Sequence, residues 1–216
     1  NMNLIDYIFE VQESAYNANK LKEILYKRLK NVKKIFNEEV IAITPNTVHL
    51  KNRTLSSKHI IVCSYANTNN ILKASNLPEL PMKVETNYVP IVILPKELQD
   101  LGITIMDGNF FSIFPHPAYN AHSIHHVKHT PLSSHYSEFY KDICKYIPAY
   151  ENTKKIKDIY ELKVKLIQNE VDDGRPIMYK KDYGFKGLDI VIGAKIDNIY
   201  DLLDLMKSSN NLNITQ

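Results

Sequence analysis

The sequence is short of glycine, cysteine and long apolar runs, and each shortage argues against a class of site. Only six glycines occur in 216 residues, and no Gly-x-Gly-x-x-Gly follows a strand, so no pyrophosphate site for a dinucleotide is expected. Cys63 and Cys144 lie far apart without a Cys-x-x-Cys pair, which argues against a disulfide framework or a zinc knuckle. No apolar run reaches the roughly 18 residues of a membrane helix. We expect a soluble, cytoplasmic protein with no membrane span.

The charge is almost balanced, and this argues against a nucleic-acid partner. Lys and Arg number 27 against 24 Asp and Glu, which leaves a formal net charge of +3. The basic residues are scattered except in the Lys-rich stretch 154–165, which is more typical of a solvated face than of an anion-binding patch. Hydrophobic residues at 44% and charged residues at 24% fit one ordinary globular domain, or two small ones sharing a core.

Hydrophobic periodicity predicts an α+β (α/β) fold with a mostly antiparallel sheet and flanking helices. Helices are predicted at 17–30, 67–75, 138–146 and 199–206, the first of them capped by Asn17 or Asn19. The segment 156–167 fits either a strand or a helix. The predicted strands cover residues 5–11, 32–36, 40–43, 48–50, 59–63, 82–94 with an interruption at Pro90, 103–106, 110–114, 122–127, 177–179 and 188–192.

The most informative run covers residues 184–200. A buried strand ends at Gly193, a short turn follows, and a helix begins near Asp197 or Asn198, both of which are good N-cap residues. Such a turn presents backbone N–H groups and the positive end of a helix to whatever lies in front of it. The alternative is a tight strand-to-helix connection without a ligand, and the run alone leaves both interpretations open.

This run resembles the C-terminal segment of FAD-dependent oxidoreductases of the D-amino-acid oxidase superfamily. The resemblance is strongest to the glycerol-3-phosphate-dehydrogenase-like and 2-hydroxyacid-oxidising branches, in which a strand leads into Gly-Gly-Lys-hydrophobic-Thr-Thr-x-Tyr. Further stretches follow in the order of that family, at 59–70, 81–87, 107–115, 122–131 and 172–183. The resemblance implies three parts: a partial FAD-domain-like segment with a helix and a small β-meander at 1–76, an antiparallel substrate-binding sheet at 77–170, and a flavin-edge strand and helix at 171–216.

The resemblance also implies FAD as cofactor and a set of residues beside the edge of the flavin. That set is Gly193, Ala194, Lys195, Ile196, Asp197 and Asn198. It departs from the family pattern, because Ala194 replaces the second glycine and Asp197 with Asn198 replaces the paired threonines. A carboxylate at this point opposes the negative charge that develops on a reduced flavin, and Lys195 can offset it.

The activity implied is oxidation of a C–H next to a hydroxyl or amino group of a small anionic substrate. Arg175 is the candidate for the anionic group, since arginine is scarce in this sequence and its planar fork suits a carboxylate or phosphate. The alternative for Arg175 is a surface ion pair with Asp172 or Asp173. His126 or His122 is the candidate proton acceptor. A separate N-terminal FAD-binding half, or a second copy of the chain, is the expected partner besides the substrate.

Six of the eight histidines lie between residues 116 and 135, which raises the possibility of a metal site. In an extended strand His122 and His126 share one face while His125 and His129 share the other, and no nearby Cys or Glu completes a tetrahedral set. We therefore predict no metal site. A second function, from another class, is a binding or assembly module that keeps the fold without flavin. The missing glycine fingerprint and the altered turn favour that alternative.

Overall fold

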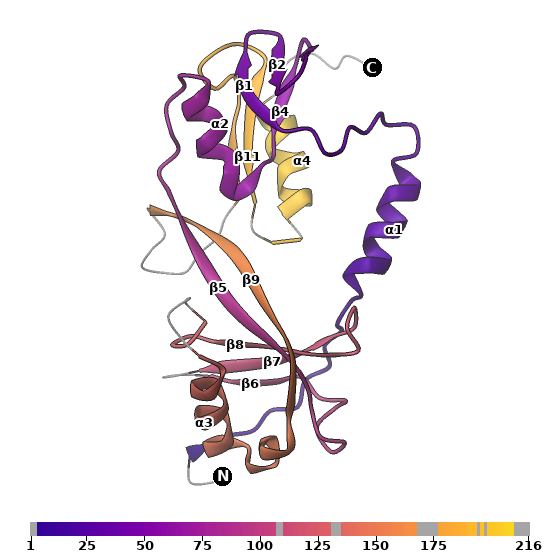
Figure 1. Cartoon of the computed structure of the whole chain (residues 1–216), viewed down its shortest axis with the longest axis vertical. Coiled ribbons are helices and arrows are strands. Elements are labelled where there is room, and N and C mark those ends of the chain that lie inside the picture. Colours follow the sequence, from indigo (N-terminus) through magenta and orange to yellow (C-terminus); the bar gives the residue numbers. More distant parts are fainter. Residues whose placement is uncertain are drawn as a thin grey trace. The chain divides into compact units, whose positions relative to one another are not determined.

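A computed structural model describes residues 4–106, 110–130, 135–167, 177–193, 195–196 and 198–209 (Figure 1). The chain divides into two compact units. The first unit consists of residues 1–33 and 86–161, and the second of residues 34–85 and 162–216. Each unit therefore contains two separate stretches of sequence. No described helix is both long and apolar enough to cross a bilayer.

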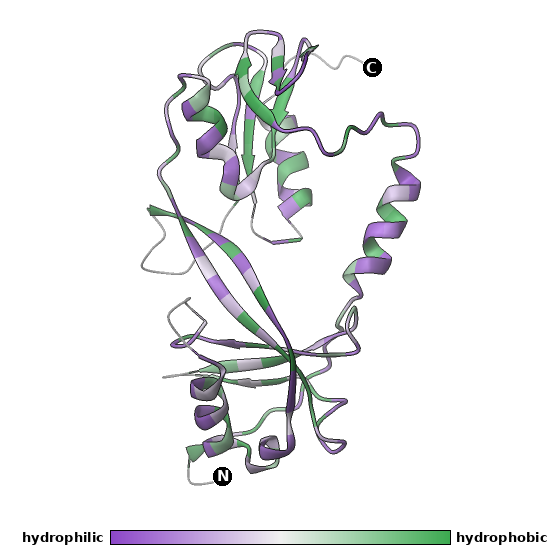
Figure 2. Ribbon diagram, in the orientation of Figure 1, coloured by the Kyte–Doolittle hydropathy of each residue, from purple (hydrophilic) through white to green (hydrophobic). Residues whose placement is uncertain are grey.

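The second unit is built on three strands from distant parts of the sequence. Strand β11 (Leu188–Ile192) pairs in parallel with β4 (Ile60–Val62) and antiparallel with β10 (Met178–Lys180). All five residues of β11 are buried, and the strand is hydrophobic along most of its length in Figure 2. Apart from Asp189 the strand is apolar, which is typical of a strand that is covered on both faces.

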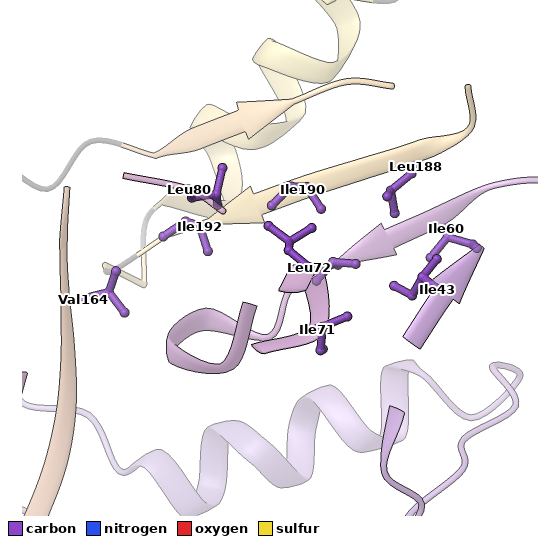
Figure 3. Close-up of a cluster of buried hydrophobic side chains, with 10 residues drawn as sticks. Ile43, Ile60, Ile71, Leu72, Leu80, Val164, Leu188, Ile190 and Ile192 are labelled. Atoms are coloured by element: carbon purple, nitrogen blue, oxygen red, sulfur yellow. The ribbon is translucent and has the colours of Figure 1, made fainter. Parts of the chain in front are cut away.

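The core of the second unit lies between β11 and helix α2 (Thr68–Ala74). Figure 3 shows Leu188, Ile190 and Ile192 of β11 near Leu72 of the helix. Leu72, Leu188 and Ile190 are fully buried. A β-meander of β1 (Val40–Thr44), β2 (Thr47–Leu50) and β3 (Thr54–Ser56) supplies Ile43 to the same core, and a 3-10 turn (Tyr65–Asn67) precedes α2. Helix α4 (Asn198–Ser209) follows β11 and contacts β10.

The first unit is built on a sheet with the strand order β6-β7-β8-β5-β9. Helix α3 (Tyr136–Tyr146) and the 3-10 turn Pro148–Asn152 pack on one face of it, where Phe139, Ile143 and Tyr150 are fully buried. Helix α1 (Ala18–Arg28) has no buried residue. The strands are β5 (Met82–Ile93), β6 (Ile103–Ile105), β7 (Phe111–His116), β8 (Ala121–His126) and β9 (Lys154–Leu166).

The antiparallel α+β class is confirmed, and several individual elements differ from the prediction. β5 runs through Pro90 without a break, and the ambiguous segment at 156–167 belongs to strand β9. Residues 5–11 and 32–36 form no strand. The first of these segments has the composition of a strand, but Tyr7 and Phe9 are 80% and 81% exposed, and no described strand pairs with it. Asn17 is the cap of α1, accepting hydrogen bonds from the amides of Asn19 and Lys20.

A buried carboxylate joins the strands of the second unit. Asp189 of β11 is 1% exposed and accepts hydrogen bonds from Tyr179 Oη at 2.7 Å, His59 Nε2 at 2.9 Å and the Asp182 amide at 3.0 Å. Burial raises the pKa of Asp189, but the hydrogen bonds from Tyr179, the Asp182 amide and His59 bring it below its ordinary value. Burial and the neighbouring carboxylate raise the pKa of Tyr179 to about 12. The ionised carboxylate therefore stabilises the fold.

We expect Asp189→Asn to lower the free energy of unfolding by about 1–3 kcal/mol, because the amide keeps the shape and loses the charge that three donors satisfy. Since folding lowers the pKa of Asp189, its contribution is present above the unfolded value of about 3.9 and is lost as the pH falls through the folded value. The difference between wild type and variant should therefore shrink below about pH 4, as measured by urea unfolding. Asp204→Asn is the control, because that side chain is 82% exposed. Equal stability of the two variants at pH 7 would contradict the prediction.

Candidate functional site

The side chain of Asn198 closes the turn that follows β11. Asn198 Oδ1 accepts a hydrogen bond from the Lys195 amide at 3.0 Å, and the Asn198 amide donates to the Lys195 carbonyl at 3.2 Å. Asn198 Nδ2 donates to Asp201 Oδ2 at 3.3 Å. A Cβ added at Gly193 would lie 3.4 Å from the Asn198 side chain. Asn198 therefore lies beside Gly193 at about van der Waals distance from where a side chain would begin.

This geometry limits what the turn can offer to a flavin. The Lys195 N–H, which the sequence analysis left available to a ligand, is already bonded to Asn198. Ile196 is 60% exposed and Lys195 is also exposed, so their side chains are accessible at the turn. Ala194 and Asp197 lie outside the described residues. Among the described residues, the turn thus offers two exposed side chains, and the sequence contains no glycine-rich cradle for a pyrophosphate.

The sheet of the first unit has two chemically different faces, which the strand register defines. Phe111 lies opposite His126, and Val92 lies opposite His122, so these side chains share the face that α3 covers. On the other face Ser112 lies opposite both His125 and Thr104, while Ser123 lies opposite Ile91. The second face is rich in hydroxyl groups, with Thr104 Oγ1 donating to Ser112 Oγ at 3.2 Å.

The structure places both candidate proton acceptors, His122 and His126, on the face toward α3. His126 is 1% exposed and its ring stacks on Phe111, with centroids 5.9 Å apart. Burial and the neighbouring His129 lower the pKa of His126 to about 4. Burial also lowers the pKa of His122. The Nε2 atoms of both rings are buried without a hydrogen-bond partner among the described residues. Both rings are therefore neutral at pH 7.

His129 lies beside His126, contrary to the sequence prediction that the two point to opposite faces. β8 ends at His126 and a turn follows, in which the amides of His129 and Thr130 donate to the His126 carbonyl. The turn cancels the strand alternation and brings the two ring centroids to 4.3 Å. His129 Nε2 lies 2.7 Å from Asp142 Oδ2. Although burial raises the pKa of Asp142, hydrogen bonds from Lys145 and His129 lower it to about 2.

Asp142 is a residue that the sequence analysis missed. It lies on α3, between the buried residues Phe139 and Ile143 of the helical face that packs on the sheet, so its helical position relative to them was the available signal. Arg175, the candidate for the anionic group of the substrate, lies outside the described residues, as do its proposed ion-pair partners Asp172 and Asp173. The structure therefore describes one histidine–carboxylate cluster on one face of the sheet and the Asn198 turn in the second unit.

The fold resembles solved structures of two oxidases and a dehydrogenase. A glycine oxidase from Geobacillus kaustophilus matches with a TM-score of 0.61 and 13% identity over 83% of this chain and 50% of its own. An iminodiacetate oxidase from Chelativorans matches with a TM-score of 0.57 and 12% identity over 80% and 47%. A glycerol-3-phosphate dehydrogenase from Bacillus halodurans, complexed with FAD, matches with a TM-score of 0.54 and 12% identity over 83% and 40%.

No protein-family profile and no curated protein sequence matches the chain. The structural matches nevertheless confirm the predicted fold, because a glycine oxidase, an iminodiacetate oxidase and a glycerol-3-phosphate dehydrogenase all share it. The chain spans about half the length of these structures. It has the fold of part of such an oxidoreductase.

We expect Asn198→Ala to loosen the turn, because the Lys195 amide then loses its acceptor. The loss of a side-chain acceptor at a helix start costs about 1 kcal/mol, so hydrogen exchange at the Lys195 amide should accelerate roughly five- to tenfold. Ile199→Ala is the control, since Ile199 is 58% exposed and lies one residue further along the same helix. Exchange at Lys195 that is equally slow in both variants would mean that Asn198 does not hold the turn.

Proposed function

We propose that this chain is the substrate-facing and C-terminal part of an FAD-dependent oxidoreductase that acts on a small, anionic substrate with a C–H next to a hydroxyl or amino group. The main support is the structural match of 80–83% of this chain to 40–50% of a glycine oxidase, an iminodiacetate oxidase and a glycerol-3-phosphate dehydrogenase complexed with FAD. The turn from Gly193 to Asn198 supports the same proposal, since a buried strand leads directly into a helix at that point.

In this proposal FAD supplies the hydride acceptor when it is bound. The chain's own residues bind and orient the substrate and contact the ring edge through Gly193–Asn198. Arg175 holds the anionic group of the substrate by a planar pair of hydrogen bonds. The pyrophosphate and adenosine are held by a separate FAD-binding half, because this sequence has no Gly-x-Gly-x-x-Gly.

The proton acceptor has to reach the substrate, and this requirement bears on both candidate histidines. His126 and His122 stay predictions for that role, but both rings lie on the face that carries α3, and the His126 side chain has no exposure. A base must come within about 3 Å of the proton that it removes, directly or through one water. Ser112, Ser123 and His125 lie on the other face of the same sheet. Both serines are also buried, so the partly exposed His125 is the alternative position from which a side chain could orient a substrate.

A non-catalytic binding or assembly module is the second candidate function. The observation that favours it is the Asn198 side chain, which lies beside Gly193 and already accepts the Lys195 N–H that a ligand would otherwise use. The colour of the complex distinguishes the two functions, because an assembly that binds flavin is yellow. A yellow, substrate-reducible complex of this chain with an FAD-binding half supports the oxidoreductase, and a colourless complex supports the module.

We expect the chain alone to bind FAD no more tightly than about millimolar. A few hydrogen bonds to the ring edge, each worth about 1 kcal/mol, do not exceed the estimated 4–15 kcal/mol that association costs. The measurement is a titration of the purified chain with FAD, followed by flavin fluorescence, with riboflavin as the control because it lacks the pyrophosphate. Both flavins should behave alike. Saturable quenching by micromolar FAD, but not by riboflavin, would reveal a pyrophosphate site in this chain.

In a flavin-containing form, Arg175→Lys should raise the KM of an acidic substrate at least about tenfold, because a point charge replaces a planar fork. Arg53→Lys is the matched control, since Arg53 forms an ion pair with Glu38 and both residues are at least partly exposed. Steady-state kinetics decide the matter. Unchanged kinetics in Arg175→Lys would place that arginine in a surface ion pair with Asp172 or Asp173.

A further inference from the structure

We propose that His126, His129 and Asp142 form a binding site for a divalent transition-metal ion, with Zn²⁺ the best fit. The proposal does not rest on the oxidoreductase function, because the three residues belong to the first unit and to the sheet face that α3 covers. The sequence analysis predicted no metal here because it placed His129 on the opposite face from His126 and did not consider Asp142.

The three side chains converge on one point. One ligand atom from each of them lies within 4.8 Å of the other two. Asp142 Oδ2 lies 2.7 Å from His129 Nε2 and 3.6 Å from His126 Nε2. Tetrahedral zinc, with bonds of about 2.0–2.2 Å, needs ligand atoms about 3.3 Å apart. Side-chain movements of less than an ångström therefore convert this cluster into three corners of a tetrahedron, and water can take the fourth.

The His126 ring gives a second observation that points to a ligand, separate from the convergence of the three side chains. Its side chain has no exposure, and its Nε2 atom has no hydrogen-bond partner among the described residues. Buried polar atoms are almost always paired in native proteins, so such an atom calls for a specific explanation. Nε2 is the ring nitrogen nearer to Asp142. A metal ion between the two would satisfy this nitrogen without any change of fold.

The surroundings of the cluster suit metal ligation. Lys145 Nζ donates to Asp142 Oδ1 at 2.5 Å, which leaves Oδ2 directed at the histidines. Glu138 Oε2 lies 3.9 Å from His129 Nδ1, on the far side of that ring from Asp142. A carboxylate behind a ligating histidine orients the ring and raises its basicity. Two imidazoles and one carboxylate favour zinc and neighbouring transition metals over Mg²⁺ or Ca²⁺, which prefer oxygen ligands alone.

Two hydrogen bonds must yield when the ion binds. His129 Nε2 loses the proton that it donates to Asp142 Oδ2, because both atoms become ligands. The second hydrogen bond involves His126. The Lys128 amide donates to His126 Nδ1 at 3.2 Å, so the neutral ring carries its proton on Nε2. Coordination through Nε2 moves the ring proton to Nδ1, and the Lys128 N–H must then turn away from it. Lys128 is exposed, so water can replace the lost acceptor. Coordination at this site therefore predicts a specific local signal, a change at the Lys128 amide, which binding elsewhere on the protein would not produce.

The test is a titration of the full chain, stripped of metal with EDTA, with Zn²⁺ in competition with a chromophoric chelator. We expect one ion per chain with micromolar or tighter affinity. His129→Gln and Asp142→Asn should each weaken binding at least about tenfold. His125→Gln is the matched control, because His125 is the neighbour of His126 and lies on the opposite face of β8. This variant should bind Zn²⁺ with the affinity of wild type. An absence of saturable binding at micromolar Zn²⁺, or an equal loss in His125→Gln, overturns the proposal.

Measurements on the wild-type chain keep the proposal testable even if the variants fold poorly. Co²⁺ should give the intense visible ligand-field bands of a tetrahedral site, without the near-ultraviolet thiolate band that Cys63 or Cys144 would produce. In amide NMR spectra, stoichiometric Zn²⁺ should shift the Lys128 resonance more than those of the exposed lysines of β9. Weak octahedral Co²⁺ bands, a thiolate band, or an unmoved Lys128 resonance would each place the ion elsewhere and refute the site.

Discussion

The parallel pairing of β4 with β11 is the constraint on which the rest of the second unit depends. His59, at the start of β4, and Asp189 of β11 are 130 positions apart and form a hydrogen bond. Between them the chain leaves the second unit along β5, builds the sheet of the first unit and returns along β9. The entropy cost of closing a loop grows only logarithmically with its length, so the apolar core around Leu72 and Ile190 can offset it. Pairing between strands so far apart in sequence is expected to form slowly, because the loop must close before the contacts are made.

Strand β11 shows why burial on both faces matters for the candidate site. Leu188, Ile190 and Ile192 face the core shared with α2, while Asp189 lies on the alternate side with its three donors. The strand is therefore fixed on both sides before it reaches Gly193. The turn that follows starts from a rigid support, and Asn198 closes it with a hydrogen bond to the Lys195 amide. A turn that is held this firmly presents a fixed surface, and this surface is either the edge contact for a flavin or a purely structural connection.

Predictions from the sequence were correct where a buried element has a local apolar pattern. They failed where the structure depends on a partner that is distant in sequence. The strand at 188–192 was predicted with its observed bounds, since an apolar run between Gly187 and Gly193 has few other solutions. Residues 5–11 have a similar composition but no neighbouring strand among the described residues. The pairing of His129 with Asp142 could not be predicted, because a turn after His126 reverses the alternation that a longer strand would have imposed. A composition can indicate a strand, but only a partner strand determines whether the strand forms.

The chemistry that a side chain can perform depends on the face of the sheet that it occupies. Helix α3 covers the face on which His122 and His126 of β8 lie. The covered face excludes water from His126 and keeps its ring neutral, which is the state that a metal ligand requires. The same cover makes a reaction with a diffusing substrate difficult on that face. An ion bound there would therefore hold α3 to the sheet rather than take part in oxidation. If it binds only the folded chain, an ion at a hundred times its dissociation constant adds about 2.7 kcal/mol of stability. The covered face of the sheet would then serve stability, while Ser112, Ser123 and His125 lie on the other face.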